Sequence, residues 1–548
     1  MKTKLKSLFF LAAFALAAGL IFTSCAKDQK GGGEEENPEY ESAYFSLRLF
    51  GGETRAGEDP GELEDGTIFE QMVKGIYVLL YDKSGNLNYG WNYDVTNIGT
   101  GGTTLVPFEN VTGDWISTQG TTDEGQMRGK AHLVKAKSYD LVVVANAGQI
   151  SGYDSTFDNG QAAGAVATNP MYNTLAALQV EQNVSLTTLG SDVTGGMFYM
   201  SNANGPVPVT IANLKVDAPT AEASPVFVNI DRALAKLSVL QDDNMIVTDG
   251  TGTEMAANVT SFMWKVNNFN TKTYLLRQYA QYSPEFPAGT AVMEEYATSI
   301  LANRKYIYAT DPNMTAGTSP DFTSEIASAR IPWGKDNFKY ATENTFDLGA
   351  QTHPDIYGYA TYLDIEAKIE FTGDAFTGTN GYYSFNNASP TTPSWVIFTW
   401  PQAKEWYEND DFPDTMSNLK AAITDLIDNG KATGVFDFKA VTDPTDPGTA
   451  DQTVIHKSEP TGLNNNVIYY HPAGLNIYRL LVKHFGVEES ANPAWGYYGV
   501  VRNNVYRLNV TEIVGPGTTT AETGYLAADI TINPWYIRPH DVTIDPER

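Results

Sequence analysis

The stretch "YLDIEAKIEFTG", residues 362–373, is the clearest indication of the fold in this chain. Apolar and charged residues alternate through it without a break, with one set made of Leu363, Ile365, Ala367, Ile369 and Phe371 and the other of Asp364, Glu366, Lys368 and Glu370. Successive side chains of a strand point to opposite faces of a sheet. This period of two therefore predicts an antiparallel strand with one buried and one solvated face.

The composition extends this prediction to the whole chain. The 548 residues include 31 Tyr, 25 Phe, 48 Gly and 27 Pro, and these residue types favour strands and turns over helices. Further strand patterns occur at 76–81, 141–144, 226–240 and 503–515. We therefore expect a mainly β protein of two large β-sandwich domains with a few short helices, the best of them after Asp414.

The net charge limits the classes of partner. The formal net charge is −29, so nucleic acid and anionic membrane surfaces are unsuitable partners.

The polar, Pro-containing residues 213–225 predict the connection between the two domains.

The first residues have the pattern of an export signal. Lys2, Lys4 and Lys6 precede an apolar run over 8–22, which is shorter than the roughly 18 residues of a membrane span and typical of a secretory signal peptide, here 1–24. Cys25 is the only cysteine, so no internal disulfide is possible. Its position after small residues resembles a bacterial lipobox, in which the thiol receives a lipid. An incidental cysteine near an ordinary cleavage site is the alternative.

A strand pattern and a protease-accessible loop follow one another near this end. Phe45, Leu47 and Leu49 alternate with Ser46 and Arg48 and predict a strand with one buried face. Gly51 and Gly52 then lead to Arg55 and Ala56, in a glycine-rich acidic loop. Such loops are preferred sites of proteolysis, whereas Arg48 lies inside the predicted strand and should be protected.

The other end of the chain repeats the strand pattern. Ala528, Ile530 and Ile532 alternate with polar residues, Pro534 and Pro539 interrupt the pattern, and Val542 and Ile544 resume it, which predicts two short strands in tandem. The Gly-, Thr- and Pro-rich residues 514–524 predict a linker that lets these strands leave the body.

Together, the two ends predict an exchange of strands. Loss of the N-terminal strand would leave unpaired backbone groups and an apolar slot in water. The C-terminal strands of another copy could fill that slot by strand addition. Because the slot and the donor are different surfaces, such joints continue head to tail into an open filament.

No pattern in the sequence predicts catalysis. The six histidines lack metal-ligand spacing, and no nucleophile elbow or P-loop occurs, so we expect neither an enzyme nor a metal or other cofactor. His471 and His484 flank a strand-like run and are expected to be surface or packed residues. The acidic loops 408–414 and 443–451 could hold Ca²⁺, but without a calcium-loop register solvated turns are the simpler interpretation.

Several segments together resemble the fimbrillin family of Bacteroidetes, the subunits of type V pili. The resemblance, closest to the minor-fimbria major subunit branch, rests on the lipobox, on Arg-Ala-Gly at 55–57, and on four segments: "VFVNIDRALAKL" (226–237), "MWKVNNFNTKTYLL" (263–276), "VVRNNVYRLNV" (500–510) and "ITINPWYI" (530–537). It implies two transthyretin-like β-sandwich domains, at 56–220 and 221–513. Residues 25–55 would then be a tether and propeptide strand, and 514–548 a linker with the donor strands.

The resemblance also implies roles for individual residues. Cys25 would carry the lipid of an outer-membrane lipoprotein precursor. An arginine-specific surface protease would cut the Arg55–Ala56 bond, and residues 526–548 would join copies of the chain, and other pilus subunits, into a cell-surface fimbria that supports adhesion.

Three alternatives to a stalk subunit stay open. A fimbrial tip adhesin only accepts a donor strand, so the well-formed C-terminal strands favour a stalk subunit. A monomeric glycan-binding surface lipoprotein could use some of the nine tryptophans as a sugar platform, but it would not need two detachable ends. A hydrolase has the least support, because no catalytic constellation is present.

Overall fold

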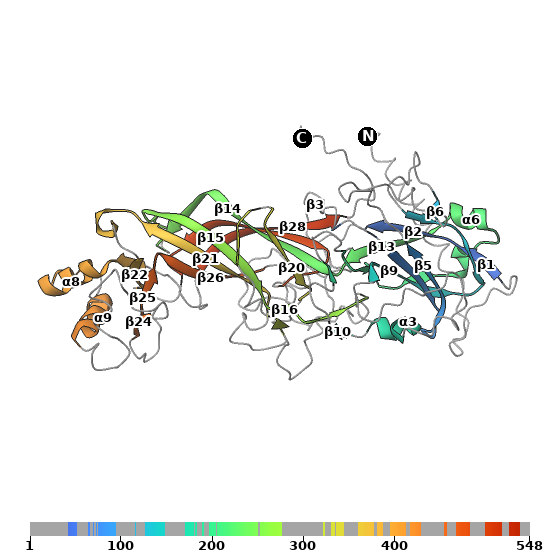
Figure 1. Ribbon diagram of the computed structural model, residues 1–548, viewed down its shortest axis with the longest axis horizontal. Coiled ribbons are helices and arrows are strands. Elements are labelled where there is room, and N and C mark those ends of the chain that lie inside the picture. Colours follow the sequence, from blue (N-terminus) through green and yellow to red (C-terminus); the bar gives the residue numbers. More distant parts are fainter. Residues whose placement is uncertain are drawn as a thin grey trace, which may run out of the picture.

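The computed structural model is mainly β, as the strand patterns predict. It describes residues 42–51, 64–65, 70, 73, 75–94, 115–116, 127–147, 170–179, 181–183, 189–190, 197–203, 205–249, 252–276, 322–323, 330–334, 336–344, 360–377, 381–386, 395–412, 417–428, 454–457, 467–482, 499–517 and 525–536. These form three regions along an elongated molecule (Figure 1).

The first region is built on a nine-stranded sheet. Its strands lie in the order β5 (Leu87–Asp94), β4 (Gly75–Tyr81), β9 (Tyr139–Ala145), β11 (Met200–Asn202), β13 (Val226–Arg232), β2 (Leu47–Gly51), β7 (Met127–Gly129) and β6 (Trp115–Ile116), with β12 (Val207–Val209) also paired to β9. Beside it, β1 (Ser42–Phe45) pairs with β8 (His132–Lys135). Helices α3 (Pro170–Asn173), α4 (Leu175–Leu178) and α6 (Ala218–Ala223) and the 3₁₀ helix η4 (Ile211–Asn213) belong to this end (Figure 1).

The middle region is a sandwich of two sheets. One contains β20 (Phe338–Thr342), β14 (Leu234–Thr248), β27 (Asn504–Val514), β28 (Tyr525–Tyr536) and β3 (Glu64–Asp65); the other contains β19 (Ile331–Pro332), β15 (Ala257–Asn267), β21 (Tyr362–Phe371) and β26 (Leu475–Leu481). Leu237 and Leu508 from the first sheet share one buried cluster with Trp264 and Ile365 from the second. The predicted β-sandwich fold is therefore confirmed.

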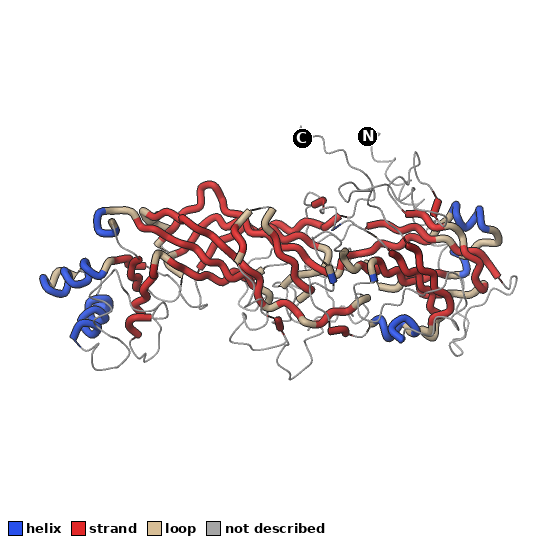
Figure 2. Tube along the Cα trace, in the orientation of Figure 1, coloured by secondary structure: helices blue, strands red, loops and turns tan. Residues whose placement is uncertain are grey.

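A small third region forms the opposite end of the molecule. Its sheet has the order β23 (Trp395–Phe398), β22 (Gly381–Asn386), β25 (Val467–Pro472) and β24 (Val454–Lys457), and α8 (Trp400–Asn409) and α9 (Ser417–Asp428) accompany it (Figure 2). Phe385, Phe398, Leu419 and Ile423 lie fully buried in its core. The remaining short elements are β10 (Glu181–Asn183) with β17 (Lys272–Tyr274), β16 (Phe269–Asn270) with β18 (Phe322–Thr323), and the 3₁₀ helix η7 (Asp374–Phe376).

The chain passes from the first sheet to the second at Ala233, which separates β13 from β14. This is later than the sequence pattern suggests, because residues 213–225 do not connect the sheets. They contain α6, and Lys215 within them exchanges two backbone hydrogen bonds with Tyr44 of β1. The segment therefore packs on the first region, and β13 completes the first sheet.

The strand at 362–371 follows its alternation closely, with one departure. Leu363, Ile365, Ala367 and Ile369 are fully buried. Asp364, predicted on the solvated face, is also buried, because Arg330 and Lys265 lie over it at 3.2 and 3.7 Å from its carboxylate.

Candidate assembly site

The N-terminal strand segment consists of β1, which pairs with β8 beside the first sheet, and β2, which lies inside that sheet. β2 runs parallel to β13 on one side and antiparallel to β7 on the other. Phe45 and Leu47 are 0% and 2% exposed and belong to the core of this region. Leu49 pairs in register with Val228 of β13 and Met127 of β7. The segment ahead of Arg55 thus supplies both backbone pairing and core side chains.

Ser46 joins the two strands and departs from the predicted alternation. It is buried, although the pattern places it with Arg48 on the solvated face. Its hydroxyl donates to the carbonyl of Gly129 at 2.7 Å, and its own carbonyl accepts from the backbone N–H of Val226 at 2.9 Å. Ser46 lies where the pairing partners of the segment change from β8 to β13 and β7, and its hydroxyl bond satisfies a buried polar group at that point.

The outer side of this segment carries exposed apolar residues. The Arg48 guanidinium lies 4.7 Å from the ring centroid of Phe227, which is 57% exposed on β13. Leu133, also exposed, stands opposite Tyr44 on β8. Val216, exposed too, follows the residue that bonds to Tyr44. Solvent-facing apolar residues therefore flank the N-terminal segment on both sides.

The C-terminal strand β28 lies in the middle region of the same chain. It pairs antiparallel with β27 from Tyr525 to Pro534, and the register sets Ala528, Ile530 and Ile532 opposite Val510, Leu508 and Tyr506, which are all buried. β28 continues through Pro534, opposite Asn504, so the predicted break at that proline does not occur. Beyond β28 on the outer side lies only the two-residue strand β3, among the residues that the structure describes.

The first part of the predicted linker is fixed in place. Gly515, Pro516 and Gly517 are buried. The Tyr478 hydroxyl donates to the carbonyl of Gly515 at 3.0 Å, and a Cβ on Gly515, whose φ is +71°, would meet the indole nitrogen of Trp395 at 2.0 Å. Only glycine fits that position. Any hinge for β28 therefore begins after Gly517.

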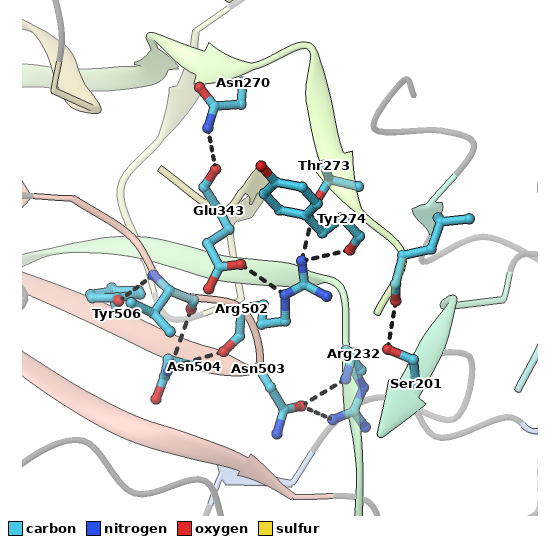
Figure 3. A network of polar contacts seen from close by, with 12 residues as sticks. Ser201, Arg232, Asn270, Thr273, Tyr274, Glu343, Arg502, Asn503, Asn504 and Tyr506 are labelled. Carbon is cyan, nitrogen blue, oxygen red and sulfur yellow. Dashed lines mark hydrogen bonds and ion pairs between the residues drawn. The ribbon is translucent and has the colours of Figure 1, made fainter. Parts of the chain in front are cut away.

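A buried polar network joins the first region to the second (Figure 3). Arg232, at the end of β13, donates from Nε to the carbonyl of Glu70 at 2.9 Å and from Nη1 to Oδ1 of Asn503 at 3.3 Å. Asn503 in turn donates from Nδ2 to Asp231 at 3.1 Å and from its backbone N–H to Leu234. Burial lowers the pKa of Arg232 to about 10, against the opposing effect of Glu70. The guanidinium stays charged at neutral pH.

The neighbouring residues extend this junction. The Glu70 carboxylate is fully buried and lies 2.8 Å from Nζ of Lys236, and it accepts from the Tyr340 hydroxyl at 2.6 Å. Arg502 donates to Glu343 at 2.9 Å and to the carbonyl of Tyr274 at 2.9 Å. The segments 226–237 and 500–510, which the family resemblance singles out, meet here. Neither alternation nor spacing in the sequence indicates this network.

His471 is packed rather than exposed. Its Nδ1 lies 3.0 Å from the carbonyl of Leu475, so Nδ1 carries the proton, and Nε2 accepts from the Ser384 hydroxyl at 2.8 Å. Burial lowers its pKa to about 4. Of the two states expected for it, surface or packed, His471 has the packed one; His484 lies outside the described residues.

Several predicted positions also lie outside the residues that the structure describes: Cys25, Arg55, Ala56, Val542 and Ile544. In the described ranges, no three His, Cys, Asp or Glu side chains are grouped so that they could hold a metal ion. Among the helices that the structure describes, none has the length and apolar character to cross a bilayer.

Comparison with known proteins agrees with the resemblance noted in the sequence. Residues 469–541 match the family model described as "Major fimbrial subunit protein type IV, Fimbrillin, C-terminal". This match covers β26, β27 and β28 and confirms the similarity to fimbrillins. No curated protein sequence matches the chain.

Solved structures with a similar arrangement have low sequence identity. A candidate cell adhesion protein of Bacteroides eggerthii is 13% identical, with a TM-score of 0.34 over 91% of this chain and 98% of that one. One from Parabacteroides distasonis is 10% identical, with a TM-score of 0.39 over 90% and 97%. The C-terminally truncated tip fimbrial protein Mfa3 of Porphyromonas gingivalis is 12% identical, with a TM-score of 0.31 over 90% and 100%.

Proposed function

We propose that this chain is a stalk subunit of a cell-surface fimbria that polymerises by donor-strand exchange and supports adhesion. The fimbrillin match over residues 469–541 supports a fimbrial subunit. The observation that most directly supports the exchange is the position of β2, which precedes Arg55 yet lies between β13 and β7 in the first sheet. A cut after Arg55 would detach a strand from the interior of that sheet.

Export and activation complete the proposal. The precursor is a lipoprotein anchored in the outer membrane through Cys25, and an arginine-specific surface protease cuts the Arg55–Ala56 bond. The departing segment removes Phe45 and Leu47 from the core and leaves the facing backbone groups of β13 and β7 unpaired. Open edges of this kind accept a new strand readily.

The donor is the C-terminal segment of the next subunit, residues 526–548. About six donor side chains, each contributing ~1.5–3 kcal/mol on burial, give ~9–18 kcal/mol in total. Association opposes this by ~4–15 kcal/mol. β28 must first leave β27, and the filled groove of the neighbour replaces the backbone pairing that it loses. Each joint leaves one groove and one donor free, so the filament continues head to tail.

The proposal is tested on the unlipidated precursor, Cys25→Ser, with an arginine-specific protease under native conditions. We expect one early cut after Arg55, followed by ladders that resist sodium dodecyl sulfate and by filaments in electron micrographs. Arg55→Ala should keep the precursor uncut at this bond and monomeric. A correctly trimmed product that stays monomeric would contradict polymerisation and favour the monomeric glycan-binding lipoprotein.

A further inference from the structure

The short strand β3 contacts both predicted partners of the exchange through one stretch of chain. Glu64 and Asp65 pair in parallel with Trp535 and Tyr536, the last two residues of β28. β27 occupies the other edge of β28. Among the described residues, β3 is therefore the strand that covers the end of β28, at its last two residues.

The chain on either side of β3 is fixed at two points. Before it, β2 ends at Gly51, inside the first sheet. After it, Glu70 is fully buried, and its carboxylate and carbonyl are bonded to Lys236, Tyr340 and Arg232 at the junction of the first and middle regions. A two-residue strand forms too few hydrogen bonds to persist alone. These two fixed points hold it beside β28.

We propose that β3 is a clasp on the C-terminal donor strand, and that the cut after Arg55 loosens it. The Arg55–Ala56 bond lies between β2 and β3, so one hydrolysis frees the N-terminal segment and also removes one of the two attachments of the clasp. This inference rests on the proposed function and adds its regulation. Closing a loop at both ends lowers the entropy that β3 gains on leaving β28, and cutting one end restores it.

The clasp couples the opening of the groove to the release of the donor. In the uncut chain β28 is paired on one edge by β27 and covered at its end by β3, so the donor is retained while the groove is full. After the cut the end of β28 at Trp535 and Tyr536 is free to separate first. Subunits therefore become donors and acceptors together, and assembly before export is suppressed.

The test is hydrogen exchange of the peptide covering residues 525–536, measured by mass spectrometry at a concentration at which light scattering shows only monomer. Exchange is compared in the uncut precursor and immediately after the cut, with residues 475–481 of β26 as the internal reference. We expect the cut to accelerate exchange at 525–536 on the order of tenfold. About two hydrogen bonds are lost, together with the loop closure that holds β3 beside β28. The reference peptide should not change.

A variant separates the clasp from the cut. Glu64→Pro with Asp65→Pro removes the backbone donors of β3 in the uncut precursor, and exchange at 525–536 should rise to the level of the cut protein. Phe322→Pro with Thr323→Pro, in the two-residue strand β18, is the matched control and should leave that exchange unchanged. If the proline pair disturbs the reference peptide, Glu64→Gly with Asp65→Gly replaces it; glycine keeps the N–H donors but weakens β3 by raising the entropy lost on ordering.

The outcomes distinguish the two proposals. If the cut protein forms ladders but exchange at 525–536 responds neither to the cut nor to the β3 substitutions, the clasp is wrong and donor-strand exchange stands. If exchange rises as expected but no ladder forms, the clasp stands and the filament proposal fails.

Discussion

The two terminal strands differ in how they are held. β2 lies between two strands, β13 and β7, and its segment places Phe45 and Leu47 in the core. β28 has one long neighbour, β27, and on its other side only the two residues of β3, within the described part of the chain. An interior strand must break two ladders at once to leave, whereas a strand near an edge can separate from one end. In the proposed exchange, the N-terminal segment would therefore leave only after proteolysis, whereas the C-terminal strand would need only to be released.

The largest expected loss of stability comes from placing a charge in the buried N-terminal segment. Phe45→Asp places a carboxylate in a site with 0% exposure, and we expect the uncut precursor to lose more than about 4 kcal/mol of unfolding free energy. Chemical denaturation measures this. Arg48→Ala on the outer side should cost under about 1 kcal/mol. Equal effects of the two substitutions would show that the segment is not an interior strand.

The next test moves the charge to the C-terminal strand. Ile532 lies opposite the buried Tyr506. We expect Ile532→Asp to lower the unfolding free energy of cut and uncut protein alike by about 2–4 kcal/mol, and to slow filament growth more than tenfold. Light scattering follows growth. Thr531→Asp, in register with Arg507 on the alternate face, is the matched control. Normal growth of the Ile532 variant would discredit the assigned donor face.

One acid-sensitive group, His471, lies in the third region, away from both terminal strands. Because burial lowers the pKa of His471 from 6.5 to about 4, the unfolded chain binds more protons between these values. Stability is then full above pH 6.5 and falls as the pH drops toward 4, by on the order of 3 kcal/mol. Exchange of the peptide 467–482 at pH 7 and 4.5 measures it. His471→Gln should reduce the dependence; an unchanged pH profile would contradict it.

A smaller effect tests whether β13 and β27, which meet at the buried polar network, open together. Asn503→Ala removes an amide that bonds to Arg232 and Asp231, next to the start of β27. We expect a loss of about 2 kcal/mol, because buried polar groups lose a partner, and faster exchange in both β13 and β27. Asn88→Ala, in a surface hairpin, is the control. Faster exchange in one of the two strands only would mean that they open independently.

The smallest effect concerns charge. Residues 1–55 hold seven basic groups (Lys2, Lys4, Lys6, Lys27, Lys30, Arg48, Arg55) and seven acidic ones (Asp28, Glu34, Glu35, Glu36, Glu39, Glu41, Glu53), so cleavage leaves the net charge at −29. Subunits must approach against this repulsion, which salt screens. We expect filament growth to quicken a few-fold between about 10 and 150 mM NaCl. Slower growth over that range would contradict this.

Much of the fold is predictable because its strands have local signals. The alternation at 362–371 indicates which residues of that strand are buried, and the apolar run in β9 indicates a strand buried on both faces. β9 lies inside the sheet. Helix α8 is not among the predicted helices, because the acidic residues 408–414 at its end indicate a solvated loop. Its signal was available: Thr399 and Gln402 form a capping box, and Pro401 stands in the first turn.

The junction between the first and middle regions is not predictable in the same way. Arg232 and Asn503 are 271 positions apart, and a charged residue inside an apolar strand pattern does not identify its partner. The same limit applies to β28. Its alternation at Ala528, Ile530 and Ile532 fits a groove in another subunit as well as the pairing with β27 that the structure contains. Alternation defines a buried face, but it does not say which neighbour buries it.

The passage from β13 to β14 through Ala233 has a mechanical consequence. One nearly continuous extended chain runs from the first sheet into the second, where β14 lies parallel to β27 over most of its length. Tension along the molecule is then carried as shear across that ladder, in which many hydrogen bonds resist together. In the proposed filament, this ladder would let each subunit bear tension along its length without unzipping from one end.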